Sequence, residues 1–196
     1  MSANTWKSIS ERKLVERDGK IPSEWRIPSD KLPSASVRDV IPSARESGLF
    51  TARELEITDS LATDIVARLA EGQWSYLEVT ETFCRRVVVA QQLVNCLSDP
   101  NFAALAQANE LDAYRAEHKK LIGPLHGLST SLKDQFRVKG LDATIRGYAG
   151  QAFQPCAEES TLVQLLHEAG AVIHTKTDVP TTLMVRSVTL HVHKHI

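Results

Sequence analysis

A strand–helix–strand pattern in the second half of the chain constrains its fold most strongly. Residues 128–132 are a brief strand candidate, and residues 171–174, Ala-Val-Ile-His, are a strong one. Between them, residues 160–169 place leucines at helical spacing, with Ser160 suited to cap the helix and Gly170 to end it. Strands joined through such a helix pair in parallel, with a right-handed connection. The pattern therefore predicts an α/β fold.

Three helices are predicted upstream of this unit. Residues 51–54 and 75–78 both have the spacing of a capping box, in which a hydroxyl and a carboxylate satisfy the free amides at a helix N-terminus. Thr58 is suited to cap a helix that ends near Gly72, and the second box opens a longer helix. A third, alanine-rich helix is expected at about residues 102–118.

Two predicted strands are too few for a complete sheet. A two-stranded sheet cannot bury its faces and leaves long unpaired edges. The amphipathic helices also need a surface to pack against, and the rest of the chain supplies little of it. We therefore expect an incomplete α/β fold that melts with low cooperativity and binds the hydrophobic dye ANS.

Residues 1–50 differ in character from the rest of the chain. Four of the eight prolines lie there, among Ser, Lys, Arg and Asp residues. Proline removes amide donors and biases its neighbours toward extended conformations. We therefore expect an extended arm over residues 1–50, a folded body over residues 51–184 and a tail of different character over residues 185–196.

Composition and charge exclude several classes of protein. Apolar residues make up 42% of the chain and the net charge is −1, so the chain is globular and has no overall field that attracts nucleic acid. The start of the chain does not resemble a signal peptide, and apolar runs such as residues 87–90 are too short to span a membrane. The three cysteines have no metal-like spacing. We therefore expect a cytoplasmic protein without metal, membrane span or nucleic-acid partner.

Lys133 follows the first strand candidate within a glycine-flanked segment. A lysine held in a dry pocket has a lowered pKa, because burial disfavours the charged amine, and the neutral amine can accept a proton from a serine. Arginine cannot do this, since its guanidinium stays charged. An isolated lysine is more often a solvated surface residue, so its position alone does not decide between these two interpretations.

The residues around Lys133 resemble a known family. Gly123-Pro-Leu-His-Gly-Leu, followed by Ser131-Leu-Lys133-Asp134, resembles the strand that carries the catalytic lysine of amidase-signature enzymes. Further matches follow in the family's order at residues 158–163, 166–172 and 176–184. Upstream, residues 21–26, 53–58 and 90–93 resemble the fungal acetamidase-like branch of that family.

The resemblance implies the N-terminal part of the amidase-signature α/β/α fold, with helices followed by the first strands of a mixed sheet. It implies hydrolysis of the carbon–nitrogen bond of a small linear amide by a Ser–cis-Ser–Lys mechanism that needs no cofactor. Lys133 would deprotonate a bridging serine, which relays a proton from the nucleophilic serine. Backbone amides of a glycine-rich loop would stabilise the oxyanion.

The resemblance also implies substrate-lining residues near the second strand. Thr177, Asp178 and Met184 lie in the stretch that borders the substrate tunnel in the family. Lys176 and Asp178 follow or end that strand at the edge where open α/β sheets place ligands. A surface ion pair between Lys176 and Asp178 is the simpler interpretation of this stretch.

The chain departs from the family pattern after Met184. The family's two serines lie in a Gly/Ser-rich segment several tens of residues beyond the lysine, whereas the last glycine of this chain is Gly170. We therefore expect a truncated amidase that is inactive alone, because a lysine base without a nucleophile contributes nothing to acyl transfer. The alternatives are a non-catalytic partner or decoy that associates with a full-length amidase, or a gene-model artefact.

Other candidate groups have simpler interpretations. Ser131, on the same strand face as the lysine, is an improvised nucleophile only if an oxyanion hole exists, and we expect it to satisfy nearby backbone instead. His126 is a conceivable base, and a structural role is expected. His191, His193 and His195 alternate, so on a strand they would face one way and could bind a metal ion. A shifted reading frame is the preferred explanation of that tail.

Overall fold

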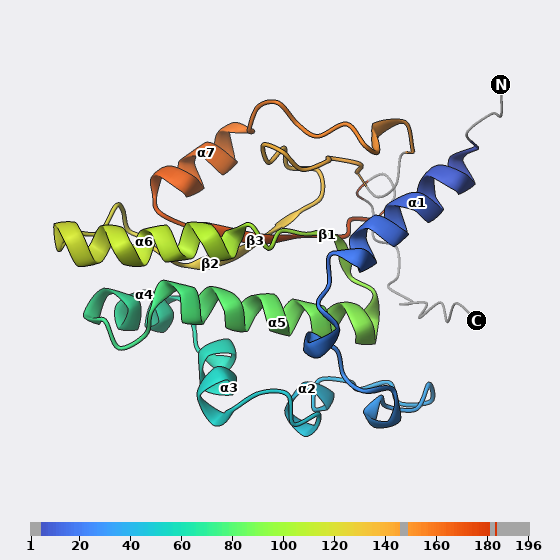
Figure 1. Ribbon diagram of the computed structural model, residues 1–196, viewed down its shortest axis with the longest axis horizontal. Coiled ribbons are helices and arrows are strands. Elements are labelled where there is room, and N and C mark those ends of the chain that lie inside the picture. Colours follow the sequence, from blue (N-terminus) through green and yellow to red (C-terminus); the bar gives the residue numbers. More distant parts are fainter. Residues whose placement is uncertain (1–4, 146–148, 181–182, 184–196) are drawn as a thin grey trace.

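The computed structural model describes residues 5–145, 149–180 and 183 (Figure 1). Within them, three strands form one mixed sheet in the order β1-β3-β2. β2 (Ser129–Lys133) pairs in parallel with β3 (Val172–Thr177), which confirms the predicted parallel pair. β1 (Leu97–Pro100) pairs antiparallel with β3 on its other side. The sequence does not predict β1, because its Ser-Asp-Pro ending is unfavourable in strands.

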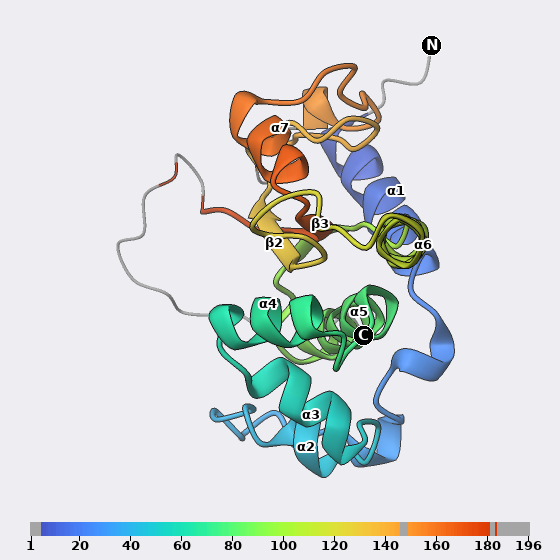
Figure 2. The ribbon, with the colours of Figure 1, turned by 90° about the vertical axis from the view of Figure 1, so that its left-hand side faces the viewer.

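Helices surround this sheet on two faces. In the described residues the α-helices are α1 (Trp6–Gly19), α2 (Ser43–Glu46), α3 (Ala52–Asp59), α4 (Ala62–Glu71), α5 (Tyr76–Val94), α6 (Ala104–His118) and α7 (Thr161–Glu168). Short 3-10 turns lie at η1 (Ser23–Trp25), η2 (Ser29–Lys31) and η3 (Ala149–Gln151). α5 and α6 lie below and beside the sheet, and α7 lies above it (Figures 1 and 2). The chain therefore has the helix–sheet–helix layering of an α/β fold.

β3 is the buried centre of the sheet. Val172 and Ile173 are both at most 1% exposed, and successive side chains of a strand point to opposite faces. Val172 packs in a cluster with α4, α5 and α6, which includes Leu69 and Val79. Ile173 packs on the opposite face with Val163 of α7. Burial on both faces is typical of a strand in a parallel or mixed α/β sheet.

The predicted helix starts are confirmed at two positions and wrong at one. Thr51 Oγ1 accepts a hydrogen bond from Glu54 N at 3.2 Å and forms the reciprocal capping box that begins α3. Ser75 Oγ accepts from Glu78 N at 3.0 Å and begins α5. Thr58 caps no helix, because it lies inside α3 and its hydroxyl donates to carbonyls of its own helix.

Helix α7, which precedes β3, buries fewer of its leucines than their helical spacing suggests. Ser160 is the N-cap of α7, but its hydroxyl donates to Arg137 O at 3.3 Å instead of accepting from the helix. Val163 is the fully buried residue of this helix. Leu162 is 44% exposed and Leu165 is 57% exposed. The outer side of α7 is therefore an apolar surface open to solvent in the described part of the chain.

The N-terminal arm differs from the extended segment predicted over residues 1–50. Residues 6–19 form helix α1, which Thr5 caps by accepting a hydrogen bond from Ser8 N. The first proline is Pro22, so no proline interrupts this helix. The sequence does not reveal α1, because charged residues leave it without an apolar stripe and none of its residues is buried. After it, the proline-containing stretch forms short turns, as the prolines indicate.

The remainder of the arm packs on α5. Ile27 is 2% exposed in a cluster with Ala44, Phe50 and Val89. Its backbone is held by both ends of one side-chain amide: Ile27 N donates to Gln92 Oε1 at 2.7 Å, and Gln92 Nε2 donates to Ile27 O at 2.8 Å. The arm is therefore held on the body by this apolar cluster and by hydrogen bonds to its backbone.

The described residues contain neither a membrane-spanning helix nor a candidate metal site. None of the helices there is long and apolar enough to cross a membrane. In the same ranges, no group of three or more His, Cys, Asp or Glu side chains is arranged to hold a metal ion. The predicted tail at residues 185–196, with His191, His193 and His195, lies outside the described residues.

Candidate functional site

Lys133 is the last residue of β2, beside the end of the central strand. Its Cα pairs with that of Thr177 in the parallel register. The strand alternates, so Leu132 is 7% exposed and faces the core while Ser131 and Lys133 are exposed. In this chain the lysine is therefore in contact with water and not enclosed in a dry pocket.

A buried ion pair anchors the backbone immediately after Lys133. Asp134 is 1% exposed, and its N–H donates to Thr177 O at 2.9 Å. Its carboxylate accepts a hydrogen bond from Thr144 Oγ1 at 2.8 Å and lies 3.3 Å from the ammonium of Lys176. Lys176 is fully buried and also donates to the backbone carbonyl of Asp142. The position of Lys133 is thus fixed through its neighbour.

The prediction of a surface ion pair between Lys176 and Asp178 is wrong. Lys176 has no exposed surface, and its carboxylate partner is Asp134. β3 is the central strand, so a side chain on its face is enclosed by the segments that follow β2. A buried ammonium is stable only when it is paired and hydrogen-bonded, and Asp134 with the Asp142 carbonyl supplies both.

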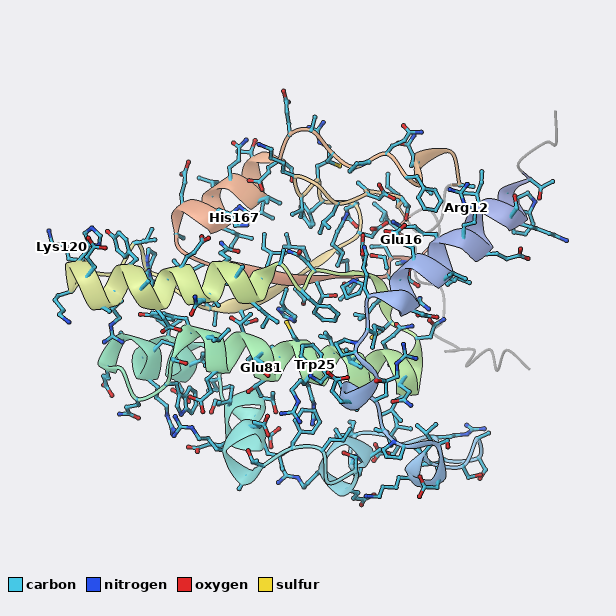
Figure 3. All side chains as sticks on the ribbon, in the orientation of Figure 1. Arg12, Glu16, Trp25, Glu81, Lys120 and His167 are labelled. Atoms are coloured by element: carbon cyan, nitrogen blue, oxygen red, sulfur yellow. The ribbon has the colours of Figure 1, made fainter. Side chains whose placement is uncertain are left out.

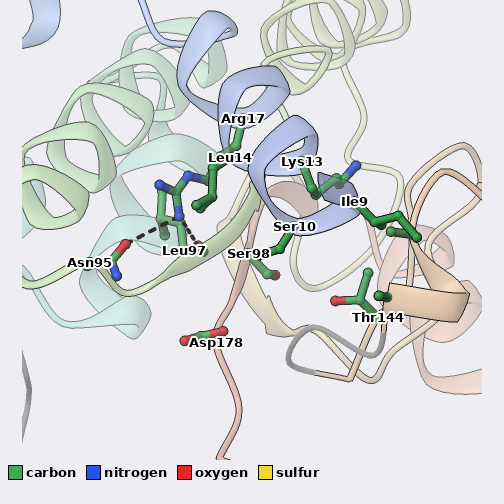
Figure 4. A pocket seen from close by; sticks show the side chains of 12 residues that line it. Ile9, Ser10, Lys13, Leu14, Arg17, Asn95, Leu97, Ser98, Thr144 and Asp178 are labelled. Carbon is green, nitrogen blue, oxygen red and sulfur yellow. Dashed lines mark hydrogen bonds between the residues drawn. The ribbon is translucent and has the colours of Figure 1, made fainter. Parts of the chain in front are cut away.

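The predicted substrate-lining residues separate in space. Thr177 stays beside Lys133, and its hydroxyl donates to Leu132 O at 3.5 Å. Asp178 turns toward the opposite edge, where its N–H donates to Cys96 O at 2.8 Å. There it lines a cavity of about 210 Å³ between α1 and the start of β1 (Figure 4). Met184 lies outside the described residues.

A serine–histidine contact that the sequence does not reveal lies at the other end of the parallel pair. Ser129 Oγ is 3.0 Å from His174 Nδ1, although the two residues are 45 positions apart. Burial lowers the pKa of His174 to about 4, so the ring is neutral and only weakly basic. A weak base makes a poor activator of a serine. The contact is therefore best explained as a buried hydrogen bond between strands.

Comparison with known protein families gives a match over the part of the chain that contains these residues. The family model described as Amidase matches residues 78–192, more than half of the chain. The chain belongs to the amidase signature family. The matched range contains Lys133, Thr177 and Asp178, and it continues beyond Met184, where the sequence motifs quoted above end.

The relatives of this amidase chain are longer than the chain itself. It is 44% identical to an acetamidase of Emericella nidulans over 92% of its own length and 32% of the relative. It is 43% identical to an acetamidase of Aspergillus oryzae over 94% of its length and 33% of the relative. The chain therefore spans about a third of the length of the curated relatives it matches.

Solved structures agree with the fold. The amidase chain superposes on a fatty acid amide hydrolase with a TM-score of 0.70 at 27% identity. The superposition covers 92% of this chain and 36% of that one. The mixed sheet and its helices are thus the amidase-signature fold, in the portion that this chain shares with the larger proteins.

The amidase segment before β2 is shaped by a histidine and two glycines. His126 is 2% exposed, its Nδ1 accepts a hydrogen bond from Ile122 N at 2.9 Å, and its ring lies edge-on to Tyr76 at 4.5 Å. Burial lowers its pKa. A Cβ on Gly127 would lie 1.8 Å from the Tyr76 ring, and one on Gly170 would lie 2.7 Å from His126 Cα. These contacts support a structural role for His126.

Proposed function

We propose that this chain is the lysine-bearing part of an amidase for small linear amides, in which Lys133 is the lysine of a Ser–cis-Ser–Lys mechanism. The observation that carries the proposal is the placement of Lys133. It ends a strand of the amidase-signature fold, inside the range matched by the family model, next to a backbone position that buried bonds hold in place. The acetamidase relatives support a small amide as the substrate.

Lys133 can act as a base only when its side chain is removed from contact with solvent. The amine is exposed in this chain, and desolvation is what would favour the neutral form. The exposed side of β2 also carries Ser131, and we propose that a further protein surface, bearing the nucleophilic and bridging serines, covers this side. Thr177, Asp178 and Met184 stay the proposed substrate-lining residues.

The 196-residue polypeptide is then inactive by itself. It holds Lys133 but no Gly/Ser-rich segment after Gly170, and members of a catalytic unit act together and not additively. Incubation of the purified chain with acetamide and aryl amides is expected to release no ammonia. Ammonia release that Lys133→Ala abolishes would overturn this part of the proposal.

A chimaera tests the role of Lys133 directly. Residues 1–184 of this chain, joined to the remaining two thirds of the Aspergillus oryzae acetamidase, are expected to hydrolyse acetamide. Loss of a general base costs roughly 10²–10⁴-fold in rate, so Lys133→Ala should reduce kcat by that factor. Lys139→Ala is the matched control, because Lys139 is also exposed and lies in the same segment. Equal activity of the two variants would contradict the assignment.

A second candidate function is a non-catalytic association with a longer amidase. Exposed Leu162 and Leu165 on α7 favour it, because exposed apolar surface tends to be covered by a partner. Size-exclusion chromatography of the chain alone and mixed with the Emericella nidulans acetamidase tests this. No change in elution on mixing rejects it.

A further inference from the structure

Helix α1 is attached to the body of the protein mainly by charged and polar groups. None of its residues is buried, and Val15 on its outer side is 74% exposed. Most helices of globular proteins are held by an apolar stripe that faces the core. The partly buried apolar side chains of α1 are Ile9 and Leu14, and charged side chains make the close polar contacts to the body. The attachment of α1 therefore responds to conditions that leave the apolar core unchanged.

Lys13 of α1 and Lys20, the residue that follows this helix, reach carboxylates of the body. Lys13 Nζ lies 2.9 Å from Asp142 Oδ2, and Lys20 Nζ lies 2.6 Å from Asp99 Oδ1. The two aspartate side chains are only 6% and 5% exposed, so the two lysines supply cations to acids that the body has largely removed from water. Glu16 of α1, which lies between the two lysines in the sequence, is 3.1 Å from both ammonium groups. The cluster ties the helix to β1 and to the loop after β2.

Two arginines of α1 add further contacts to the body. Arg17 Nη1 donates to Leu97 O at 3.2 Å and to Asn95 Oδ1 at 3.3 Å. Toward the N-terminus, the Arg12 guanidinium lies over the ring of Phe153 at 4.5 Å. Figure 3 labels Arg12 and Glu16 along α1, beside the segment that contains η3. The contacts thus follow α1 for most of its length.

α1 forms one wall of the cavity that Asp178 lines (Figure 4). The helix contributes Ile9, Ser10, Lys13, Leu14 and Arg17 to this wall. On the opposite wall lie Ser98 and Thr144 together with Asp178. The Ser98 hydroxyl is buried and has no hydrogen-bond partner among the described residues. Movement of α1 away from the body would therefore open this cavity and its buried Ser98 hydroxyl, next to the end of β3.

We propose that α1 is a cover over this cavity that is held in place by ion pairs and is released when Lys13 is removed. Salt screens ion pairs to nearly buried carboxylates much less than solvent-exposed pairs, so a substitution, and not salt, is the change that breaks these contacts. Lys13 is the decisive group, because its carboxylate partner, Asp142, also holds buried Lys176 through its backbone carbonyl. The cover is thereby connected to the anchor beside Lys133.

Hydrogen exchange of the full chain measures whether α1 opens. Lys13→Gln should raise the exchange rate of the α1 amides on the order of tenfold or more, since the nearly buried Asp142 carboxylate loses its cation. Lys7→Gln is the matched control: it removes the same charge from the same helix, and Lys7 lies over the ring of Trp6 in that helix. About 1 M NaCl should raise α1 exchange of the unsubstituted chain far less, because pairs to nearly buried carboxylates are weakly screened, and the amides of α5 should keep their protection in both lysine variants.

A second readout separates opening of the cover from fraying of the helix. A thiol introduced by Ser98→Cys lies in the cavity wall. Its alkylation, mapped by peptide mass, should accelerate on the order of tenfold when Lys13→Gln is added, and not when Lys7→Gln is added. Faster α1 exchange without faster alkylation, or α1 exchange that is equal in both lysine variants, overturns the proposal.

Discussion

The ammonium of Lys176 lies 3.3 Å from the carboxylate of Asp134, and neither side chain is more than 2% exposed. This pair joins the central strand to the residue that follows Lys133. Removal of one member of a buried ion pair leaves the other uncompensated, which costs about 3–5 kcal/mol. The pair is therefore the contact on which the geometry of the candidate site depends most strongly.

Replacement of Lys176 should destabilise the chain severely. We expect Lys176→Met to lower the free energy of unfolding by about 3–5 kcal/mol in urea titrations, because the Asp134 carboxylate stays buried without its cation. Lys120→Met serves as the control, since Lys120 projects outward near the end of α6 (Figure 3). Equal urea midpoints for the two variants would show that the buried pair does not matter for stability.

Gly127 should not tolerate a side chain. Its φ is +78°, and a Cβ would overlap the ring of Tyr76. Gly140 has a similar φ of +82° but open space around it. Gly140→Ala should thus cost only the backbone strain of about 1–2 kcal/mol, whereas Gly127→Ala should cost clearly more. Thermal unfolding of both variants measures the difference, and equal losses would refute the predicted clash.

The free energy of unfolding should fall as the pH drops from about 6.5 to about 4, because in this range His174 is neutral in the folded chain and protonated in the unfolded chain. Its folded pKa is about 4, below the ordinary value of 6.5, so between these values the unfolded chain binds a proton that the folded chain excludes. Stability from this group is present above about pH 6.5 and is lost progressively down to about pH 4, on the order of 3 kcal/mol in total.

A glutamine at position 174 isolates this contribution. His174→Gln keeps a polar group near Ser129 but does not titrate, so its stability should fall less between neutral pH and about pH 4. His118→Gln, at an exposed site, should follow the unsubstituted chain. Parallel pH profiles for His174→Gln and the unsubstituted chain would contradict the assignment.

The small sheet should make unfolding poorly cooperative. β2 and β1 are the outer strands of the three-stranded sheet, and two leucines of α7 are exposed in the described residues. We expect ANS fluorescence in native buffer and a broad thermal transition by circular dichroism. A sharp two-state melt without ANS binding would contradict this expectation.

Local signals in the sequence predict local structure well here. The hydroxyls of Thr51 and Ser75 begin helices where their spacing predicts, because capping depends on residues three positions away. The parallel pair follows from the helix between its strands. Thr58 shows the limit of such signals, because it lies inside α3 and the next helix begins after Leu61 without a side-chain cap.

Contacts between distant parts of the sequence are what the sequence alone does not reveal. β1 forms although its residues disfavour strands, because β3 offers it a free edge. Lys176 is buried because Asp134, remote in sequence, meets it across the sheet. The Ser129–His174 contact arises in the same way. In each case tertiary pairing outweighs the local pattern.

The central claim is that Lys133 belongs to an amidase mechanism whose nucleophile is absent from these 196 residues. Incubation of the full chain with a fluorophosphonate probe, followed by intact-mass measurement, tests it most directly. We predict no change in mass. A covalent adduct on any serine of the chain, lost in Lys133→Ala, would contradict it.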